Sequence, residues 1–176
     1  QSYVKQLIDV TKSWNCSDVT YTTVRLEDFF ADIKEQALGL VEIYHQKIDW
    51  KAEQSDKKVT IAYDPMFRAV MNMIQNAVEH TKENGIIYID AKEQDGRLTF
   101  IVEDSGSGFT KEALLHGTEQ FFMDDTSRNG EAHYGMGLFF AKTVAEKYGG
   151  GIKLSNSENT GGARVEIFFL SSQETS

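Results

Sequence analysis

Two asparagines, Asn72 and Asn76, lie four residues apart in a segment whose apolar residues repeat with helical spacing. In a helix, side chains four residues apart project from the same face, so the two amides are expected to lie one above the other. An amide oxygen is a hard ligand of the kind that Mg²⁺ accepts beside water and nucleotide phosphates. Asn76 is therefore a candidate metal ligand, although such a pair is also typical of a solvated helix face.

A second candidate site is Asp104-Ser-Gly-Ser-Gly108, which directly follows an apolar, strand-like run. Asp and Gly at these positions suit an ordinary tight turn. They also suit recognition of adenine, because a carboxylate only accepts hydrogen bonds and so pairs with the exocyclic amino group of adenine, not with the carbonyl of guanine. Gly106 and Gly108 would let the backbone close onto the base and sugar.

The third candidate is Gly135-Met-Gly137-Leu138, at the expected start of a helix. No strand immediately precedes it and no Gly-Lys-Ser/Thr follows it, so neither a Rossmann dinucleotide site nor a Walker loop is indicated. Two glycines at a helix start leave amide N–H groups free to point at phosphate oxygens, aided by the helix dipole. A plain glycine-rich helix entry is the alternative.

Hydrophobic periodicity predicts the elements that must position these residues. Strands are expected at 19–25, 48–53, 58–63, 86–91, 97–103, 151–154 and 163–170, and helices from Asp28, from Asp64, and over 110–115 and 136–148. Asp64-Pro65 is an expected helix start, with Asp64 as N-cap and Pro65 at the first helical position. Hairpins are expected for 48–63 with its turn at 54–57, for 86–103 around Gln94-Asp95-Gly96, and for 151–170.

This order predicts an α+β fold, a two-layer sandwich in which a mixed, mostly antiparallel sheet is packed on one face by helices. The length of 176 residues, 40% of them hydrophobic, suits a single domain, expected at 19–170. Residues 1–18 are expected to form a helix end over 3–14 and a linker, and 171–176 a disordered tail. The polar stretch 117–134 is expected to be a flexible loop.

The composition excludes some classes of function. A net charge of −9 argues against a nucleic-acid partner, because binding a phosphate backbone needs a basic face. The one cysteine, Cys16, has no internal disulfide partner, which fits a reducing, cytoplasmic location. No run of apolar residues is long enough for a transmembrane helix.

Taken in order, the three motifs resemble the N, G1 and G2 boxes of the ATP-binding catalytic domains of sensor histidine kinases, and Phe121-Phe122 resembles the F box. The resemblance runs from about Val19 to Leu170. It implies a Bergerat-type ATP-binding fold that binds Mg²⁺ and ATP, with Asp104 on adenine, Asn76 on the metal and Arg128 reaching the phosphates from a lid at 117–134. The implied nucleotide-binding residues are Asn76, Asp104, Gly106, Gly108, Phe121, Phe122, Arg128, Gly135, Gly137 and Leu138.

The same resemblance assigns the catalytic position to Asn72. In the superfamily shared with gyrase, the heat-shock chaperone and mismatch-repair ATPases, hydrolysing members carry Glu there to activate water. An Asn cannot act as a base, so this site suits phosphoryl transfer to a histidine, whose neutral imidazole needs little deprotonation. Two alternatives stay open: a catalytically silent nucleotide-binding regulatory module, and an ATPase of the gyrase or chaperone type.

The resemblance also implies partners. In the family the phosphoacceptor histidine is followed by Glu and lies on a separate dimerisation segment. None of the four histidines, His45, His80, His116 and His133, is followed by Glu. Residues 1–18 are then the stump of a dimerisation helix, the piece itself is expected to be a monomer, and the parent a homodimeric sensor of a two-component system that passes phosphate to a response regulator.

Four positions depart from the family pattern: Glu79, Thr118, His133 and Ala163. Glu79 stands where a basic residue often faces the phosphates, and its charge would oppose ATP unless it turns outward or the metal neutralises it. Lys82 is a candidate replacement. Lid closure is the property that these changes are expected to alter.

Overall fold

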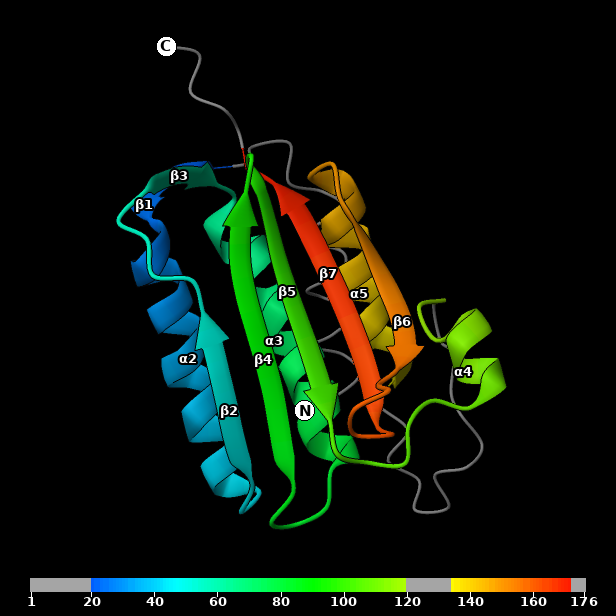
Figure 1. Ribbon diagram of the computed structural model, residues 1–176. Helices are drawn as coiled ribbons and strands as arrows, with labels where there is room; N and C mark the ends of the chain where they lie inside the picture. The colour runs from blue at the N-terminus through cyan, green and yellow to red at the C-terminus, as the bar shows by residue number, and fades with distance from the viewer. Residues whose placement is uncertain (1–19, 120–133, 172–176) are drawn as a thin grey trace.

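The computed structural model describes residues 20–119 and 134–171, with the side chains of 134–136 left out of the description. A five-stranded sheet carries one layer of long helices on a single face, with the strands running roughly along the helix axes (Figure 1). The helices are α2 (Leu26–Ile43), α3 (Tyr63–His80), α4 (Lys111–His116) and α5 (Tyr134–Lys147). The strands are β1 (Thr22–Arg25), β2 (Lys47–Ala52), β3 (Lys58–Ile61), β4 (Ile86–Gln94), β5 (Arg97–Asp104), β6 (Gly151–Asn156) and β7 (Ala163–Leu170).

The main sheet has the strand order β2-β4-β5-β7-β6. Its β2 and β4 are parallel, and the other neighbouring pairs are antiparallel. A separate two-stranded sheet joins β1 to β3. The predicted class, an α+β sandwich with a mixed, mostly antiparallel sheet and helices on one face, is confirmed.

The predicted hairpin over 48–63 is wrong. β2 pairs in parallel with β4, and β3 pairs with β1, so the two strands that are adjacent in sequence belong to different sheets. The linking residues 54–57 contain no Gly or Asn for the left-handed backbone of a tight hairpin turn. In the parallel arrangement Ile48 and Trp50 pack against the helix-covered core. The free energy gained by this packing exceeds what pairing with the adjacent β3 would provide.

The hairpin at Gln94-Asp95-Gly96 is confirmed. Gln94 lies opposite Arg97, which leaves Asp95 and Gly96 as a two-residue turn, and both have positive φ, 52° and 81°. This is the backbone of a type I′ turn, which favours Asp-Gly. The closing hairpin of β6 and β7 is also as predicted.

Helix α3 begins two residues earlier than predicted, at Tyr63 in place of Pro65. Its N-cap is Ala62, with no side-chain cap, and Asp64 and Pro65 lie inside the first turn. Pro is tolerated there because the first N–H groups of a helix have no intrahelical partner. The predicted apolar face is confirmed, since all of its members are buried: Met66, Val70, Met73, Ile74, Ala77 and Val78.

The core lies between this helix layer and the sheet. Its largest members include Phe100 of β5, whose ring contacts both Phe29 of α2 and Phe169 of β7 edge-on, and all three are fully buried. Burying one such side chain stabilises the fold by about 1.5–3 kcal/mol. Helix α2 begins at Leu26, two residues before the predicted Asp28, because the fully buried Leu26 already belongs to its core-facing side.

Two predicted features fall outside the described residues, namely the helix end at 3–14 and most of the loop at 117–134. The predicted short helix after the glycine motif is present as α4, and the Thr110 hydroxyl caps it by accepting a hydrogen bond from the Ala113 amide at 3.1 Å. Within the described part of the chain, no helix is both long and apolar enough to cross a bilayer.

Candidate nucleotide-binding site

Helix α3 brings the candidate motifs together. Asn72, Asn76 and His80 follow one another at four-residue intervals on this helix, about 6 Å apart along its axis. At the Asn72 end lies Gly137 of α5, where an added Cβ would be 3.9 Å from the Asn72 carbonyl oxygen. At the His80 end lies Gly106, where an added Cβ would be 2.6 Å from the His80 carbonyl oxygen. The structure therefore places all three motifs along one helix.

Asp104 ends β5 and is only 2% exposed. Its Oδ1 accepts hydrogen bonds from the Gly106 amide at 2.9 Å and from the Ala163 amide at 3.0 Å. No residue in the described ranges donates to its second oxygen, Oδ2. The carboxylate is thus fixed through one oxygen, and the other remains available as an acceptor.

The environment of Asp104 acts on its protonation in two opposing ways. Burial raises its pKa above the ordinary value of 3.8, and the hydrogen bonds from Gly106 and Ala163 lower it, with burial the stronger effect. A buried carboxylate gains from a further donor, because each hydrogen bond to the charged form offsets part of its lost hydration.

Two glycines make this arrangement possible through contacts within the chain. At Gly162 of the β6–β7 turn an added Cβ would lie 2.0 Å from the Asp104 carbonyl oxygen, and at Gly106 it would collide with the end of α3. The sequence interpretation had Gly106 making room for a base. In the structure Gly106 makes room for the His80 carbonyl, so the fold requires a glycine at this position even without a ligand.

The β6–β7 turn supports Asp104 from a second direction. The Thr160 hydroxyl donates to the Asp104 carbonyl oxygen at 2.8 Å and accepts from the Gly162 amide at 3.0 Å. Sequence reasoning identified 159–162 only as a turn and noted Ala163 only as a departure. The adjacent pair Gly161-Gly162 was the available signal of a close backbone approach.

Asn76 is 6% exposed, and its Oδ1 is buried without a hydrogen-bond partner among the described residues. Buried polar atoms normally have a partner, so an orphaned oxygen is an exception that needs an explanation. An amide oxygen suits Mg²⁺, which takes few protein ligands and keeps water and phosphate oxygens for the rest. No cluster of three or more His, Cys, Asp or Glu side chains suited to a metal occurs in the part of the chain described here.

Gln46 was not singled out from the sequence. It lies just before β2, is buried, and its Nε2 donates to the carbonyl oxygens of Val78 at 2.9 Å and Thr81 at 2.6 Å. The last carbonyls of a helix have no intrahelical partner, so this side chain satisfies the end of α3. A Gln far away in sequence gives no local sign of such a role.

The remaining predicted residues are placed as follows. Asn72 is half-buried. Leu138 of α5 is fully buried, and its side chain packs in the hydrophobic core. Gly108 has a φ of +84°, a backbone conformation that favours glycine. Gly135 lies in the first turn of α5. Phe121, Phe122, Arg128 and His133 fall outside the described residues.

Glu79, one of the departures from the family pattern, is half-buried and paired on its own helix. The Gln75 Nε2 donates to its Oε1 at 2.9 Å. Thr118 is half-buried and Lys82 is exposed.

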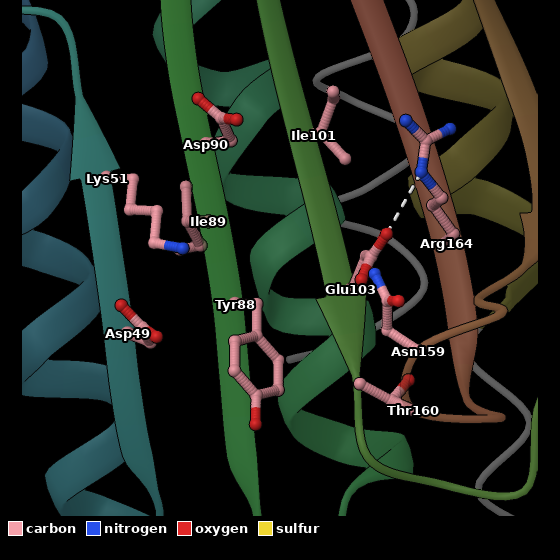
Figure 2. Close-up of a pocket in the computed structure, with 10 residues that line it drawn as sticks. All are labelled: Asp49, Lys51, Tyr88, Ile89, Asp90, Ile101, Glu103, Asn159, Thr160 and Arg164. Atoms are coloured by element: carbon pink, nitrogen blue, oxygen red, sulfur yellow. Dashed lines mark hydrogen bonds and ion pairs between the residues drawn. The ribbon is translucent and has the colours of Figure 1, made fainter.

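A cavity of about 400 Å³ lies elsewhere, on the face of the sheet away from the helices (Figure 2). Its lining includes Asp49, Lys51, Tyr88 and the ion pair in which Arg164 Nε donates to Glu103 Oε1 at 3.0 Å. Lys51 lies opposite Asp90 in the sheet register. The charges on this face are mixed and largely balanced, as on a solvated sheet surface, and none of the predicted site residues lines the cavity.

Comparison with known proteins gives a consistent picture. The family model described as "Histidine kinase-, DNA gyrase B-, and HSP90-like ATPase" matches residues 62–173. The sensor histidine kinase SpaK of Bacillus subtilis is 30% identical over 167 residues, which cover 95% of this chain and 36% of SpaK. The nisin biosynthesis sensor protein NisK of Lactococcus lactis subsp. lactis is 31% identical over 166 residues, 93% of this chain and 36% of NisK. The chain therefore spans about a third of the length of these relatives.

Solved structures share the fold. The catalytic domain of histidine kinase ThkA matches with a TM-score of 0.73 at 20% identity, over 88% of this chain and 99% of that one. Full-length ShkA in complex with AMPPNP matches with a TM-score of 0.76 at 19% identity, over 96% of this chain and 35% of that one. Because the family model covers more than half of the sequence and the relatives are sensor kinases, this chain belongs to the histidine kinase-, DNA gyrase B- and HSP90-like ATPase family, as the ATP-binding catalytic domain of a histidine kinase.

Proposed function

We propose that this domain binds Mg²⁺-ATP and, in its parent protein, transfers the γ-phosphoryl group to a histidine on a separate dimerisation segment. The observation that carries the proposal is Asp104, a carboxylate 2% exposed whose Oδ1 is saturated by two backbone amides. The other oxygen, Oδ2, accepts from no described residue, so it selects a ligand that presents a donor, as the exocyclic amino group of adenine does.

Asn76 is the proposed metal ligand. Its buried, unpaired Oδ1 fits a hard cation, and the turn of α3 that carries it lies between the turns that meet Gly137 and Gly106. Bound Mg²⁺ would neutralise charge on the phosphates during transfer. The same positive charge would offset the repulsion between the phosphates and Glu79, whose carboxylate already accepts a hydrogen bond from Gln75.

Asn72 stands one turn before Asn76, where a hydrolysing site needs a base. Its amide does not accept a proton at neutral pH, so it cannot activate water. We assign it the positioning of the reacting phosphate, with the first turn of α5 at Gly137 directly beside it. Free amide N–H groups at the start of α5, with Gly135, would face the phosphates, and Phe121, Phe122 and Arg128 would contribute from the lid.

The acceptor histidine is proposed to lie outside the described domain. Among the described histidines, His45 is exposed at a positive φ of 54°, and His116 is paired with Glu119. The parent is proposed to be a homodimeric sensor with this domain on the cytoplasmic side, and its phosphohistidine to be read by a response regulator. The solved complex of ShkA with AMPPNP, a protein of the same fold, supports the nucleotide assignment.

Titration calorimetry with Mg²⁺-ATP tests the proposal. Asp104→Asn turns an acceptor into a group that can present a donor to adenine, and a mismatch at a buried site costs about 1–3 kcal/mol, which is roughly 5-fold to 150-fold in affinity. We expect the wild-type chain to bind Mg²⁺-ATP and Asp104→Asn to bind it more weakly by this factor. Equal affinities of the two proteins would show that Asp104 does not hold the base.

A silent nucleotide-binding module is the second candidate, favoured by the acidic Glu79 beside the Asn72 and Asn76 positions. Supplying the parent's dimerisation segment in trans separates the two. Phosphohistidine formation supports the kinase, whereas bound ATP without phosphohistidine supports the silent module. Steady hydrolysis by the domain alone would instead indicate an ATPase of the gyrase or chaperone type.

A further inference from the structure

The glycine loop (residues 105–108) is tethered at both ends to one hairpin, that of β6 and β7. At its start, Asp104 accepts hydrogen bonds from the Ala163 amide and the Thr160 hydroxyl. At its end, Phe109 is held by the side chain of Asn156. The Phe109 amide donates to Asn156 Oδ1 at 2.7 Å, and Asn156 Nδ2 donates to the Phe109 carbonyl oxygen at 3.1 Å.

Asn156 acts here as a substitute for a strand partner. A carboxamide carries one acceptor and one donor group, so it can pair with both backbone groups of a single residue, 47 positions away in this case. Gly108 lies against it, since an added Cβ there would be 2.9 Å from Asn156 Oδ1 and 2.9 Å from the Gly161 carbonyl oxygen. A residue with a Cβ at position 108 would therefore collide with Asn156 and with the Gly161 carbonyl.

Among the described residues, the Asn156 side chain forms hydrogen bonds with Phe109 alone. Asn156 is exposed, and it is the last residue of β6. The apolar contacts at this point are made by Phe109, whose ring is buried. What the Asn156 bonds fix is the path of the chain from the glycine loop into α4, which begins two residues after Phe109.

We propose that Asn156 is a positioning residue for nucleotide binding, which holds the glycine loop in its binding shape before the ligand arrives. The inference rests on the proposed function, because it assumes that Asp104 receives the base. Ordering a loop on binding lowers affinity, and a loop that is already ordered avoids this loss. Asn156 makes no contact with the nucleotide in this scheme and acts through the loop.

The test compares Asn156→Ala with Asn159→Ala in the whole chain. Asn159 is the same residue type on the same hairpin, and its side chain lies at the open-face cavity (Figure 2). By calorimetry at a temperature where every variant is folded, Asn156→Ala should weaken Mg²⁺-ATP and Mg²⁺-ADP by the same factor, about tenfold, for the loss of two hydrogen bonds. Asn159→Ala should stay within about twofold, as surface substitutions do.

Hydrogen exchange of the Phe109 amide gives an independent reading. This amide should exchange faster in Asn156→Ala and at the parental rate in Asn159→Ala, because only the first substitution removes its acceptor. Asn156→Asp is a second variant that keeps an acceptor for this amide but turns another acceptor toward the Phe109 carbonyl, so it should also weaken both nucleotides.

The outcomes separate the inference from the proposed function. Faster exchange at Phe109 with parental affinities in both Asn156 variants would make the residue purely structural and would overturn the inference, while ATP binding stands. A loss confined to ATP would place the effect at the phosphates and would overturn it as well. Absence of nucleotide binding by the wild-type chain would instead overturn the proposed function, and the inference with it.

Discussion

Asp104 and Asn76 are both buried polar residues of the proposed site, but the fold satisfies them differently. Asp104 receives two backbone amides on one oxygen, from its own loop and from β7. Asn76 receives none on its Oδ1 from the described residues. The proposed base-facing end is thus organised by the chain itself, whereas the proposed metal-facing end has an acceptor that no described residue satisfies.

This difference has an energetic consequence. An unpaired buried acceptor costs about 1–3 kcal/mol, and Asn76 Oδ1 has no partner among the described residues. A ligand that coordinates this oxygen recovers the loss. Substitutions at the glycines that pack around Asp104 should therefore damage the fold, whereas changes at Asn76 should damage only binding.

The largest expected effect is that of Gly162→Ala at the organised end. The added Cβ would lie 2.0 Å from the Asp104 carbonyl oxygen, so the turn has to move, and we expect the unfolding free energy to fall by about 3 kcal/mol. Gly161→Ala is the matched control, because its φ of +74° strains the backbone but no atom lies within 4 Å, and it should cost only about 1 kcal/mol. Equal losses in urea unfolding would contradict the close approach at Gly162.

Asn76→Ala tests the other end. We expect the unfolding free energy to stay within about 1 kcal/mol of the parent's, because the lost packing is offset by removal of an unpaired buried oxygen. The gain in ATP affinity on adding Mg²⁺ should fall about tenfold or more, since a metal ligand is lost. Calorimetry with and without Mg²⁺ measures this gain, and an unchanged metal dependence would remove Asn76 from the metal site.

The pH dependence of stability provides a subtler comparison through Asp104→Asn. Burial raises the pKa of Asp104 above 3.8, so the folded state binds the proton more tightly than the unfolded chain does. Its contribution to stability is then fully present below pH 3.8 and is lost as pH rises through the folded pKa. The ligand-free Asn variant, which does not ionise, should be the more stable protein near pH 7, and the difference should disappear below pH 3.8.

Urea unfolding at several pH values follows this difference directly. A gap that widens on acidification would mean that the hydrogen bonds to the carboxylate outweigh its burial. The same variant should lose nucleotide affinity near neutral pH, so greater stability and weaker binding are expected from one substitution.

The smallest expected effect on the fold is that of Gly137→Ala, at the metal-facing end. The added Cβ would meet the Asn72 carbonyl oxygen at 3.9 Å, an ordinary contact, and Ala is favoured over Gly inside a helix by up to about 1 kcal/mol. Gly106→Ala is the counterpart at the base-facing end, where the contact with the His80 carbonyl is 2.6 Å. Thermal unfolding should show a slightly higher Tm for the first and a clearly lower Tm for the second.

Much of this architecture was predictable because it depends on short-range patterns. The Asp95-Gly96 turn and the buried face of α3 from Met66 to Val78 follow from turn and periodicity rules. The roles of Gln46 and Asn156 were not predictable, because each is a single polar side chain bonded to backbone groups distant in the sequence. The prediction that β2 pairs with β3 was wrong for a related reason. A short connecting loop permits a hairpin without requiring one, and β2 pairs with the more distant β4.

The sequence alone identified the candidate residues for the chemistry, because residue type at fixed spacing limits what Asn76 and Asp104 can bind. Only the tertiary structure decided how they are held. Asp104 is oriented by the Ala163 amide and the Thr160 hydroxyl, from a hairpin more than fifty residues further along the chain. Contacts between such distant segments arise from the packing of the whole sheet against α3, and local sequence patterns do not encode them.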